Sequence, residues 1–321
     1  MNLDKMLKRC EREQWQMDAV DWDAPVSPPS PEMEEAVVQC FTDMAAIERL
    51  AAALFEEQAR RAESPTLRRI FESFVADELR HAEAASLLAA RHDVRRLRSY
   101  AVRPALTRFA SSFVDAVRCL PPDVANAYIM VGELILDTAL LRSLDDAVDD
   151  AVTRAVMSLV NRDESRHIAV DFHMFDHYAS DAYARRAAAE PARPVATQLA
   201  GAIALCRLLR DARPFFRQVF VDPMALVDPS GRRLKEASRR LQIVLRRPGA
   251  DRQPFVAFIG VLFSAYQHPV VRAVAGPALE RLVGIEPELL RRLYTEHELR
   301  RAAAMTMDEL AAEALEERRA A

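Results

Sequence analysis

The sequence predicts an all-helical protein built around a bundle of four helices. Only 7 of its 321 residues are glycine, and the alternation of apolar and polar residues that marks a strand is scarce. Half of the residues are hydrophobic, so a chain of this length can bury a large core. Two long helical stretches also carry the same short motif, Glu78-x-x-His81 and Glu164-x-x-His167, each about 30 residues after a lone glutamate.

The first two helices of the bundle are predicted from their start signals. Ser30-Pro31 offers a cap residue followed by proline in the first turn, and a helical pattern then runs to about residue 63. Ser64-Pro65 repeats the signal and starts a helix that reaches about residue 92. The break lies midway between Glu48 and Glu78, so an antiparallel pair of helices brings these two glutamates to the same level.

The second pair of helices is predicted between Pro121-Pro122 and about Tyr178. Its turn falls at residues 148–150, midway between Glu133 and Glu164, where an aspartate can cap the next helix. The intervening residues 93–120 must cross from one end of the bundle to the other, with a short helix from about residue 104 to 120. Corresponding residues of the two halves are 85 or 86 positions apart, which indicates an internal two-fold repeat.

The chain therefore divides into an arm, a bundle and an extension. Residues 1–30 form an N-terminal arm that Trp15 and Trp22 pack onto the body, and residues 31–180 form the four-helix bundle. Residues 181–321 form a helical extension packed on the bundle. Its helices are predicted at about 193–212, 231–246, 253–266, 269–284 and 286–318.

Six side chains are predicted to converge inside the bundle. Residues three apart on a helix share a face, so each Glu-x-x-His pair points two ligands at one spot, and two such pairs with two single glutamates make a di-metal carboxylate site. Without metal the four carboxylates would repel one another, whereas two divalent cations would neutralise them. Oxygen-rich ligation with one imidazole per metal suits iron or manganese, although affinity alone does not exclude zinc. The predicted ligands are Glu48, Glu78, His81, Glu133, Glu164 and His167.

Polar residues around these ligands are predicted to support them. Asp77 and Asp163 each stand four residues before the histidine of their own motif, and we expect each to accept the ring N–H of the histidine across the bundle. Helical spacing places Asp137, Asn161 and Asp171 next to the ligands, where we expect a hydrogen-bond network.

The inner helix faces also predict a space for a substrate. The aromatic and thioether side chains of Phe55, Phe74 and Met130 lie on the ligand faces and are expected to line a pocket beside the metals. Asn126 lies on the same face as Glu133 but two turns away, and we expect it to face solvent at the end of the bundle.

Composition argues for a cytoplasmic protein that binds neither nucleic acid nor membranes. The net charge of −4 comes from interspersed charges of both signs, which gives no basic groove. The N-terminus is too charged for a signal peptide, and the longest apolar run, residues 254–266, is too short to span a bilayer. The four cysteines form no Cys-x-x-Cys motif and are expected to be reduced thiols.

The repeated pattern Glu-x(n)-Asp-Glu-x-x-His resembles the ferritin-like di-iron oxygenases, particularly the p-aminobenzoate N-oxygenase (AurF-like) family. The resemblance covers about residues 30–180 and implies a ferritin-like bundle with one long crossover. It implies two irons, with manganese as an alternative at one site, held by the six predicted ligands, of which Glu78 and Glu164 would bridge. It also implies O2 as co-substrate, a small organic substrate, an external reductase or ferredoxin as electron donor, and a homodimer.

One position departs from the family pattern. The arylamine N-oxygenases have a further histidine one turn before the last glutamate, where this chain has Val160. The resemblance implies a monooxygenase-like oxidoreductase, and three reactions therefore remain open: N-oxygenation, hydroxylation and desaturation. The alternatives are a ferritin- or rubrerythrin-like iron-handling protein and a non-catalytic helical scaffold stapled by metal.

Overall fold

The computed structural model describes residues 1–26, 30–135, 139, 141–247, 249–283, 288–305 and 309. These residues form helices joined by turns, and none of them lies in a β-strand. The all-helical fold class predicted from composition is therefore confirmed.

In the N-terminal part the helices are α1 (Leu3–Arg12), a 3₁₀ turn (Met17–Ala19), α2 (Pro31–Arg61), α3 (Pro65–His92), α4 (Pro104–Cys119), α5 (Pro122–Ile135), α6 (Arg142–Ala147) and α7 (Ala151–Ala179). The C-terminal part contains α8 (Asp181–Ala189), α9 (Val195–Phe215), a π-helical turn (Phe216–Val221), α10 (Asp222–Val227), α11 (Arg232–Leu245), a 3₁₀ turn (Ala250–Arg252), α12 (Pro254–Gln267), α13 (Pro269–Val283) and α14 (Glu296–Ala304).

The first hairpin, α2 and α3, begins where its capping residues predict. The Ser30 hydroxyl accepts a hydrogen bond from the backbone N–H of Met33 at 3.4 Å, and proline follows it in the first turn. Ser64 does the same for α3, accepting from the backbone N–H of Leu67 at 3.0 Å. These serine caps satisfy N–H groups that a helix start leaves unpaired, so they fix both helix starts.

The second hairpin differs from the first because π-helical geometry occurs between its described α5 and α6 segments. α5 ends at Ile135, Ala139 and Leu141 have π-helical geometry, and the short helix α6 follows before the turn. After the turn, the Asp150 carboxylate accepts a hydrogen bond from the backbone N–H of Thr153 at 2.9 Å and starts α7, as the sequence predicts. A π-helical turn marks an extra residue in a helix, and such turns are frequent at functional sites.

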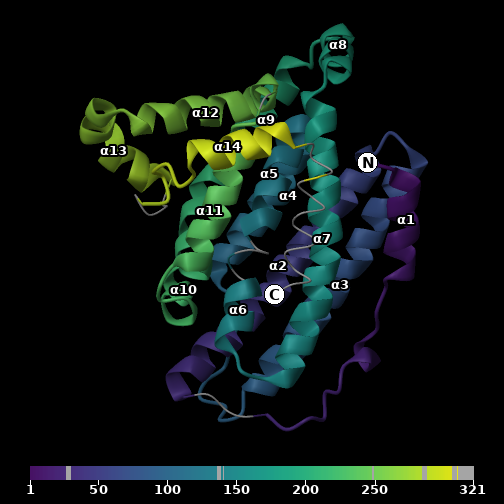
Figure 1. Ribbon diagram of the computed structural model, residues 1–321, viewed down its shortest axis with the longest axis vertical. Helices are drawn as coiled ribbons and strands as arrows, with labels where there is room; N and C mark the ends of the chain where they lie inside the picture. The colour runs from purple at the N-terminus through teal and green to yellow at the C-terminus, as the bar shows by residue number, and fades with distance from the viewer. Residues whose placement is uncertain are drawn as a thin grey trace.

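The long helices run side by side along the long axis of the molecule (Figure 1). α2 packs against α3, α5 against α7, and α3 against α7, while α4 crosses between the hairpins against α2. The N-terminal arm begins with α1, which packs against α3, and then runs along the bundle to the start of α2. The C-terminal helices pack on the bundle from the other side, α9 on α4, α10 on α2, and α11 and α12 on α5.

The extension departs from its predicted boundaries in three places. α8, the π-helical turn and α10 were not predicted, because their sequences carry no strong apolar periodicity over enough residues. Residues 288–295 form turns rather than the start of the last predicted helix, which begins at Glu296 with a capping box on Thr295. Of the rest of that predicted helix, residues 286, 287, 306–308 and 310–318 lie outside the described residues.

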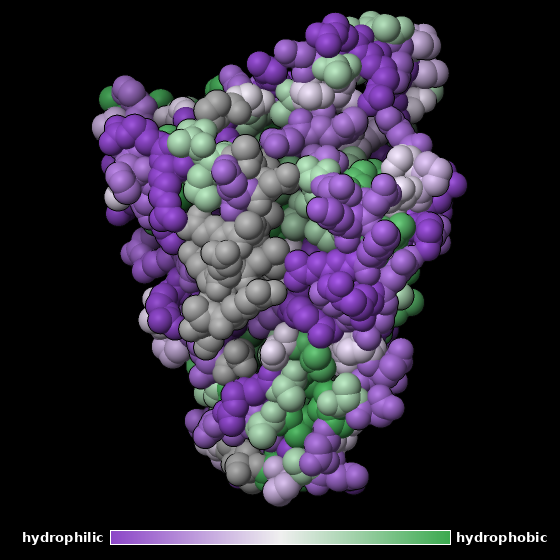
Figure 2. Space-filling view, turned by 45° about the vertical axis from the view of Figure 1, so that its right-hand side comes forward, coloured by the Kyte–Doolittle hydropathy of each residue, from purple (hydrophilic) through white to green (hydrophobic). Residues whose placement is uncertain are grey.

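Among the described residues, no helix combines the length and the apolar character that crossing a bilayer requires. The described surface seen in Figure 2 is mostly hydrophilic, with apolar residues gathered toward its lower end.

Candidate metal centre

The structure brings all six predicted ligands together inside the bundle. The six residues are distributed over four helices. They lie at the same height along the bundle because each hairpin turns midway between its two glutamate positions. None of the six is more than 5% exposed. They are Glu48 on α2, Glu78 and His81 on α3, Glu133 on α5, and Glu164 and His167 on α7.

The six side chains form two overlapping groups, each with ligand atoms within 4.8 Å of one another. Glu78 and Glu164 belong to both groups, which is the position of a bridging carboxylate. Each group adds one histidine and one single glutamate to this shared pair. The first group is completed by Glu48 and His81, and the second by Glu133 and His167.

Both histidine rings face the carboxylates with the same nitrogen. Nδ1 of His167 lies 2.9 Å from a carboxylate oxygen of Glu78, and Nδ1 of His81 lies 3.2 Å from an oxygen of Glu164. Neither Nδ1 atom has a hydrogen-bond partner, and neither do the two carboxylate oxygens of Glu78. Buried polar atoms without partners are rare and call for an explanation, and a role as metal ligands provides one.

The opposite ring nitrogens face two buried aspartates. Nε2 of His167 lies 3.3 Å from Asp77, and Nε2 of His81 lies 3.2 Å from Asp163, so each aspartate pairs with the histidine across the bundle. Such contacts fix the tautomer that leaves Nδ1 free to bind a metal ion. Arg166 joins the two pairs, because its guanidinium lies 3.0 Å from Asp77 and 2.8 Å from Asp163.

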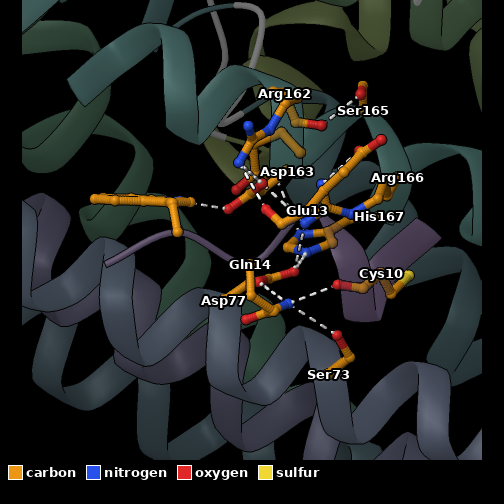
Figure 3. A network of polar contacts seen from close by, with 12 residues as sticks. Cys10, Glu13, Gln14, Ser73, Asp77, Arg162, Asp163, Ser165, Arg166 and His167 are labelled. Carbon is orange, nitrogen blue, oxygen red and sulfur yellow. Dashed lines mark hydrogen bonds and ion pairs between the residues drawn. The ribbon is translucent and has the colours of Figure 1, made fainter. Parts of the chain in front are cut away.

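The N-terminal arm reaches this aspartate layer, which the sequence did not indicate. Gln14 donates a hydrogen bond to Asp77, and the indole N–H of Trp15 donates one to Asp163, both at 2.8 Å. Figure 3 shows how Gln14 approaches Asp77, with Arg166 close by. Trp15 was expected only to pack the arm, and a single polar contact of this kind leaves no periodic signal in a sequence.

The glutamates of the centre differ in the direction in which their surroundings shift their pKa values. Burial, and then the charges of Glu78 and Glu164, raise the pKa of both Glu48 and Glu133 well above the usual range. Burial would also raise the pKa of Glu164, but its contacts with His167 and His81 outweigh burial and hold it far below the usual range. Without metal, protons therefore reside where cations would bind, and metal binding must release them.

The pKa values of the two histidines are also set by burial and by the neighbouring charges. Burial would lower the pKa of His81, but the neighbouring carboxylates of Asp163, Glu164 and Glu78 stabilise the protonated ring, outweigh burial and raise the pKa well above its usual value. The pKa of His167 is raised in the same way, chiefly by the charge of Glu164 against the effect of burial. In both rings a proton on Nδ1 occupies the position that a metal ion would take.

The remaining polar residues predicted near the ligands divide into three cases. Asp171 is fully buried, and burial raises its pKa to about 8, but neither of its carboxylate oxygens makes a hydrogen bond, contrary to the predicted network. Asn161 is partly buried on α7, three residues before Glu164. Asp137 lies outside the described residues.

The residues predicted to line a substrate pocket are all buried core residues. The ring of Phe74 lies 4.2 Å from that of His167 and the ring of Phe55 lies 5.1 Å from it, measured between centroids. Met130 is 0% exposed. Val160, at the position of the family's additional histidine, is fully buried as well. The two phenylalanines thus form an apolar wall against one histidine.

Two cavities lie between the helices, one beside the centre and one at the end of the bundle, and neither is lined by those three residues. One, of about 130 Å³, is bounded by α2, α4, α5 and α9 and reaches Glu133. The other, of about 270 Å³, lies at the α2–α3 turn. Asn126 lines this second cavity and is only 2% exposed, so the expectation that it faces solvent is wrong, because α8 and the end of α7 cover this end of the bundle.

No protein-family model matches this chain, and a comparison with curated proteins gives no match either. The described residues themselves define an all-helical protein that contains two buried groups of glutamate and histidine able to bind metal ions.

Proposed function

We propose that this chain is a ferritin-like, non-haem di-iron oxygenase or oxidase that uses O2 to oxidise a small organic substrate. One observation carries the proposal: two groups of three glutamates and one histidine overlap at Glu78 and Glu164, and all six side chains are buried. Such an arrangement, with its ligands on four helices, is the pattern of di-metal carboxylate bundles.

The donor set fits two iron ions, with manganese as an alternative at one of them. Carboxylate oxygens with one imidazole nitrogen per metal suit iron or manganese. Four carboxylates and two divalent cations balance in charge, which removes the repulsion that raises the pKa of Glu48 and Glu133. When bound, the irons would supply the activation of O2.

The protein would contribute ionised ligands, their orientation and the exclusion of water. Asp77 and Asp163 hold the two rings with Nδ1 turned toward the glutamates. Glu48 and Glu133, whose pKa values are raised in the metal-free protein, would release their protons when the metal ions bind. The rings of Phe55 and Phe74 keep water away from His167.

The reaction balances only with an external electron donor. In hydroxylation or N-oxygenation, one oxygen atom enters a C–H or N–H bond of the substrate, and two electrons and two protons convert the other to water. In desaturation the substrate loses two hydrogen atoms, and both oxygen atoms leave as water with the same external electrons and protons. A reductase or ferredoxin would supply the electrons, and a homodimer is part of the proposal through the resemblance alone.

Iron handling and a non-catalytic scaffold are the two alternatives. The apolar cavity beside Glu133 favours oxidation of an organic molecule, because a route for hydrated iron would need polar side chains along it. A scaffold would have no use for a cavity that reaches a ligand.

Metal content and optical spectra test the proposal. Purified protein loaded anaerobically with Fe(II) should hold about two irons per chain, and mixing it with O2 should produce a transient band in the visible region. Glu164→Ala should lose at least one iron, whereas the matched control Glu83→Ala, on the exposed face of α3, should keep both. Absence of bound transition metal in the folded wild-type protein would falsify the proposal. Two bound irons with no response to O2 would favour the scaffold.

A further inference from the structure

The cavity beside Glu133 has an almost wholly apolar wall. It is lined by side chains from α2, α4, α5, α9 and the π-helical turn, and has a volume of about 130 Å³. Among its lining residues are Ile47, Phe109, Ile129, Leu208 and Phe215.

This cavity touches the metal centre directly. Glu133, one of the six predicted ligands, is part of its wall, and Ile47 precedes the ligand Glu48 in the chain. A molecule in the cavity would therefore lie against the ligand shell.

The wall provides no partner for a charged ligand. Of the described residues that line the cavity, Glu133 is the one with a charged side chain, and arginine, lysine and histidine are absent from that set. The Tyr128 hydroxyl is the other polar side-chain group there. A charged group among these apolar side chains would lose its hydration and gain no polar partner from them, which is strongly unfavourable. The occupant must be uncharged.

The volume limits the size of the occupant. A dry cavity of about 150 Å³ lined by aliphatic and aromatic side chains binds benzene. At about 130 Å³, this cavity holds a group of about six carbon atoms and little more.

We propose that the cavity is the substrate site, and that the group oxidised is an uncharged aromatic ring or an alkyl group of about six carbons. The inference rests on the proposed function, since only an oxidising centre makes the occupant a substrate. It excludes a free carboxylate or ammonium group next to the reacting atoms. Any charged part of the substrate must lie outside the cavity.

Gly132 offers a way to fill the cavity without disturbing its wall. It lies on α5 and lines the cavity, and a Cβ atom added there would meet no atom within 4 Å. Gly132→Leu should occupy the space of the ligand, and replacing a helical glycine should not weaken α5. Ala212→Leu fills the cavity from the opposite wall, on α9 and far in sequence from the predicted ligands. Gly260→Leu is the matched control, because Gly260 also has open space around it but lies on α12, away from the cavity.

The test is calorimetric titration of the full chain, with and without iron, using toluene, benzoate and benzylamine as probes. Toluene should bind saturably at one site per chain, and the two charged probes should bind at least tenfold more weakly. Gly132→Leu and Ala212→Leu should each weaken toluene binding at least tenfold while keeping the wild-type iron content. Gly260→Leu should leave toluene binding unchanged.

The outcomes separate this inference from the proposed function. Iron binding without toluene binding overturns the inference alone, as does benzoate binding as tight as that of toluene. Binding of xenon but not of toluene also overturns it, because the cavity would then admit only gases. Toluene binding by a protein that never takes up metal overturns the proposed function, and the assignment of a substrate fails with it.

Discussion

Asp77 on α3 lies 3.3 Å from Nε2 of His167 on α7, so its carboxylate supports a histidine of the other hairpin. The Asp163–His81 pair repeats this contact in the opposite direction at 3.2 Å. Together the two pairs fix both rings with Nδ1 toward the glutamates. The effect of each carboxylate can be measured separately from folding.

Asp77→Asn is expected to lower metal affinity by about 10- to 100-fold, the usual effect of losing an outer partner of a ligating histidine. Asparagine keeps the shape of the side chain but removes the charge that favours the Nδ1-free tautomer of His167. Competition with a chelator gives the affinity, and circular dichroism checks the fold. Asp115→Asn, at an exposed position of α4, is the control. Equal metal affinities for the two variants would rule out this role for Asp77.

Trp15→Phe is expected to destabilise the protein by about 1–3 kcal/mol, because buried Asp163 loses the hydrogen bond from the indole N–H. Metal affinity should fall as well, since Asp163 contacts His81. Trp22→Phe is a matched control, because the Trp22 indole donates to the backbone oxygen of Met17 within the arm itself. Urea denaturation and chelator competition give the two quantities. If both variants change metal affinity equally, the arm acts by packing alone.

Arg166→Met is expected to cost about 3–5 kcal/mol in stability, the range for removing one partner of a buried ion pair. Arg166 is fully buried and contacts both Asp77 and Asp163. Its loss would leave only the Arg80 guanidinium, which contacts Asp77 and lies 3.6 Å from Asp163, as a cation beside both carboxylates among the described contacts. Arg162→Met should cost much less, because the Arg162 side chain is 38% exposed and donates mainly to a backbone oxygen of Glu13. Urea denaturation at one pH compares them. Similar costs would mean that Arg166 is not needed to hold the aspartates.

The metal-free protein is expected to become less stable as the pH rises toward 8. Burial raises the pKa of Asp171 to about 8, so the folded state holds this proton more tightly than the unfolded chain does. The resulting stability is fully present below the unfolded pKa of about 4 and is lost as the pH rises through the folded pKa, at about 1.4 kcal/mol per pH unit for one group.

Asp171→Asn tests this assignment, because an amide resembles the protonated carboxyl but does not titrate. Thermal unfolding from pH 5 to pH 9 in the presence of a chelator should show a variant that gains on the wild type as the pH rises. The raised pKa values of Glu48, His81 and His167 act in the same direction in both proteins. The charge of Asp171 is the smallest of the named causes that raise the pKa of Glu133, and the variant loses that contribution together with the Asp171 charge. Parallel curves would show that Asp171 does not titrate in this range.

Much of the bundle could be predicted because its signals are local. Ser30-Pro31 and Ser64-Pro65 start α2 and α3 through caps that need only neighbouring residues. The spacing of three between glutamate and histidine sets a common helix face whatever else surrounds it. The six buried side chains, and the aspartates that cross to the opposite histidines, follow from this periodicity.

The features that sequence could not predict depend on contacts between distant segments. Trp15 reaches Asp163, 148 residues away, through a single hydrogen bond. Asn126 is buried because α8 and the end of α7 close the bundle there, and α8 has too weak a pattern to be predicted. The cavity beside Glu133 exists because α9 covers α5, which no property of α5 alone requires.

The reciprocal aspartate–histidine pairs have a further consequence for how the centre assembles. Asp77 and His81 of the first hairpin correspond to Asp163 and His167 of the second, and each aspartate contacts the histidine of the other hairpin. The site therefore lies on an approximate two-fold axis that relates the two hairpins. A single hairpin would contain an aspartate and a histidine that face away toward absent partners. A polypeptide that contained only one such hairpin could therefore build the same centre only by associating with a second copy, and joining two hairpins through the crossover replaces that association with a folding step inside one molecule.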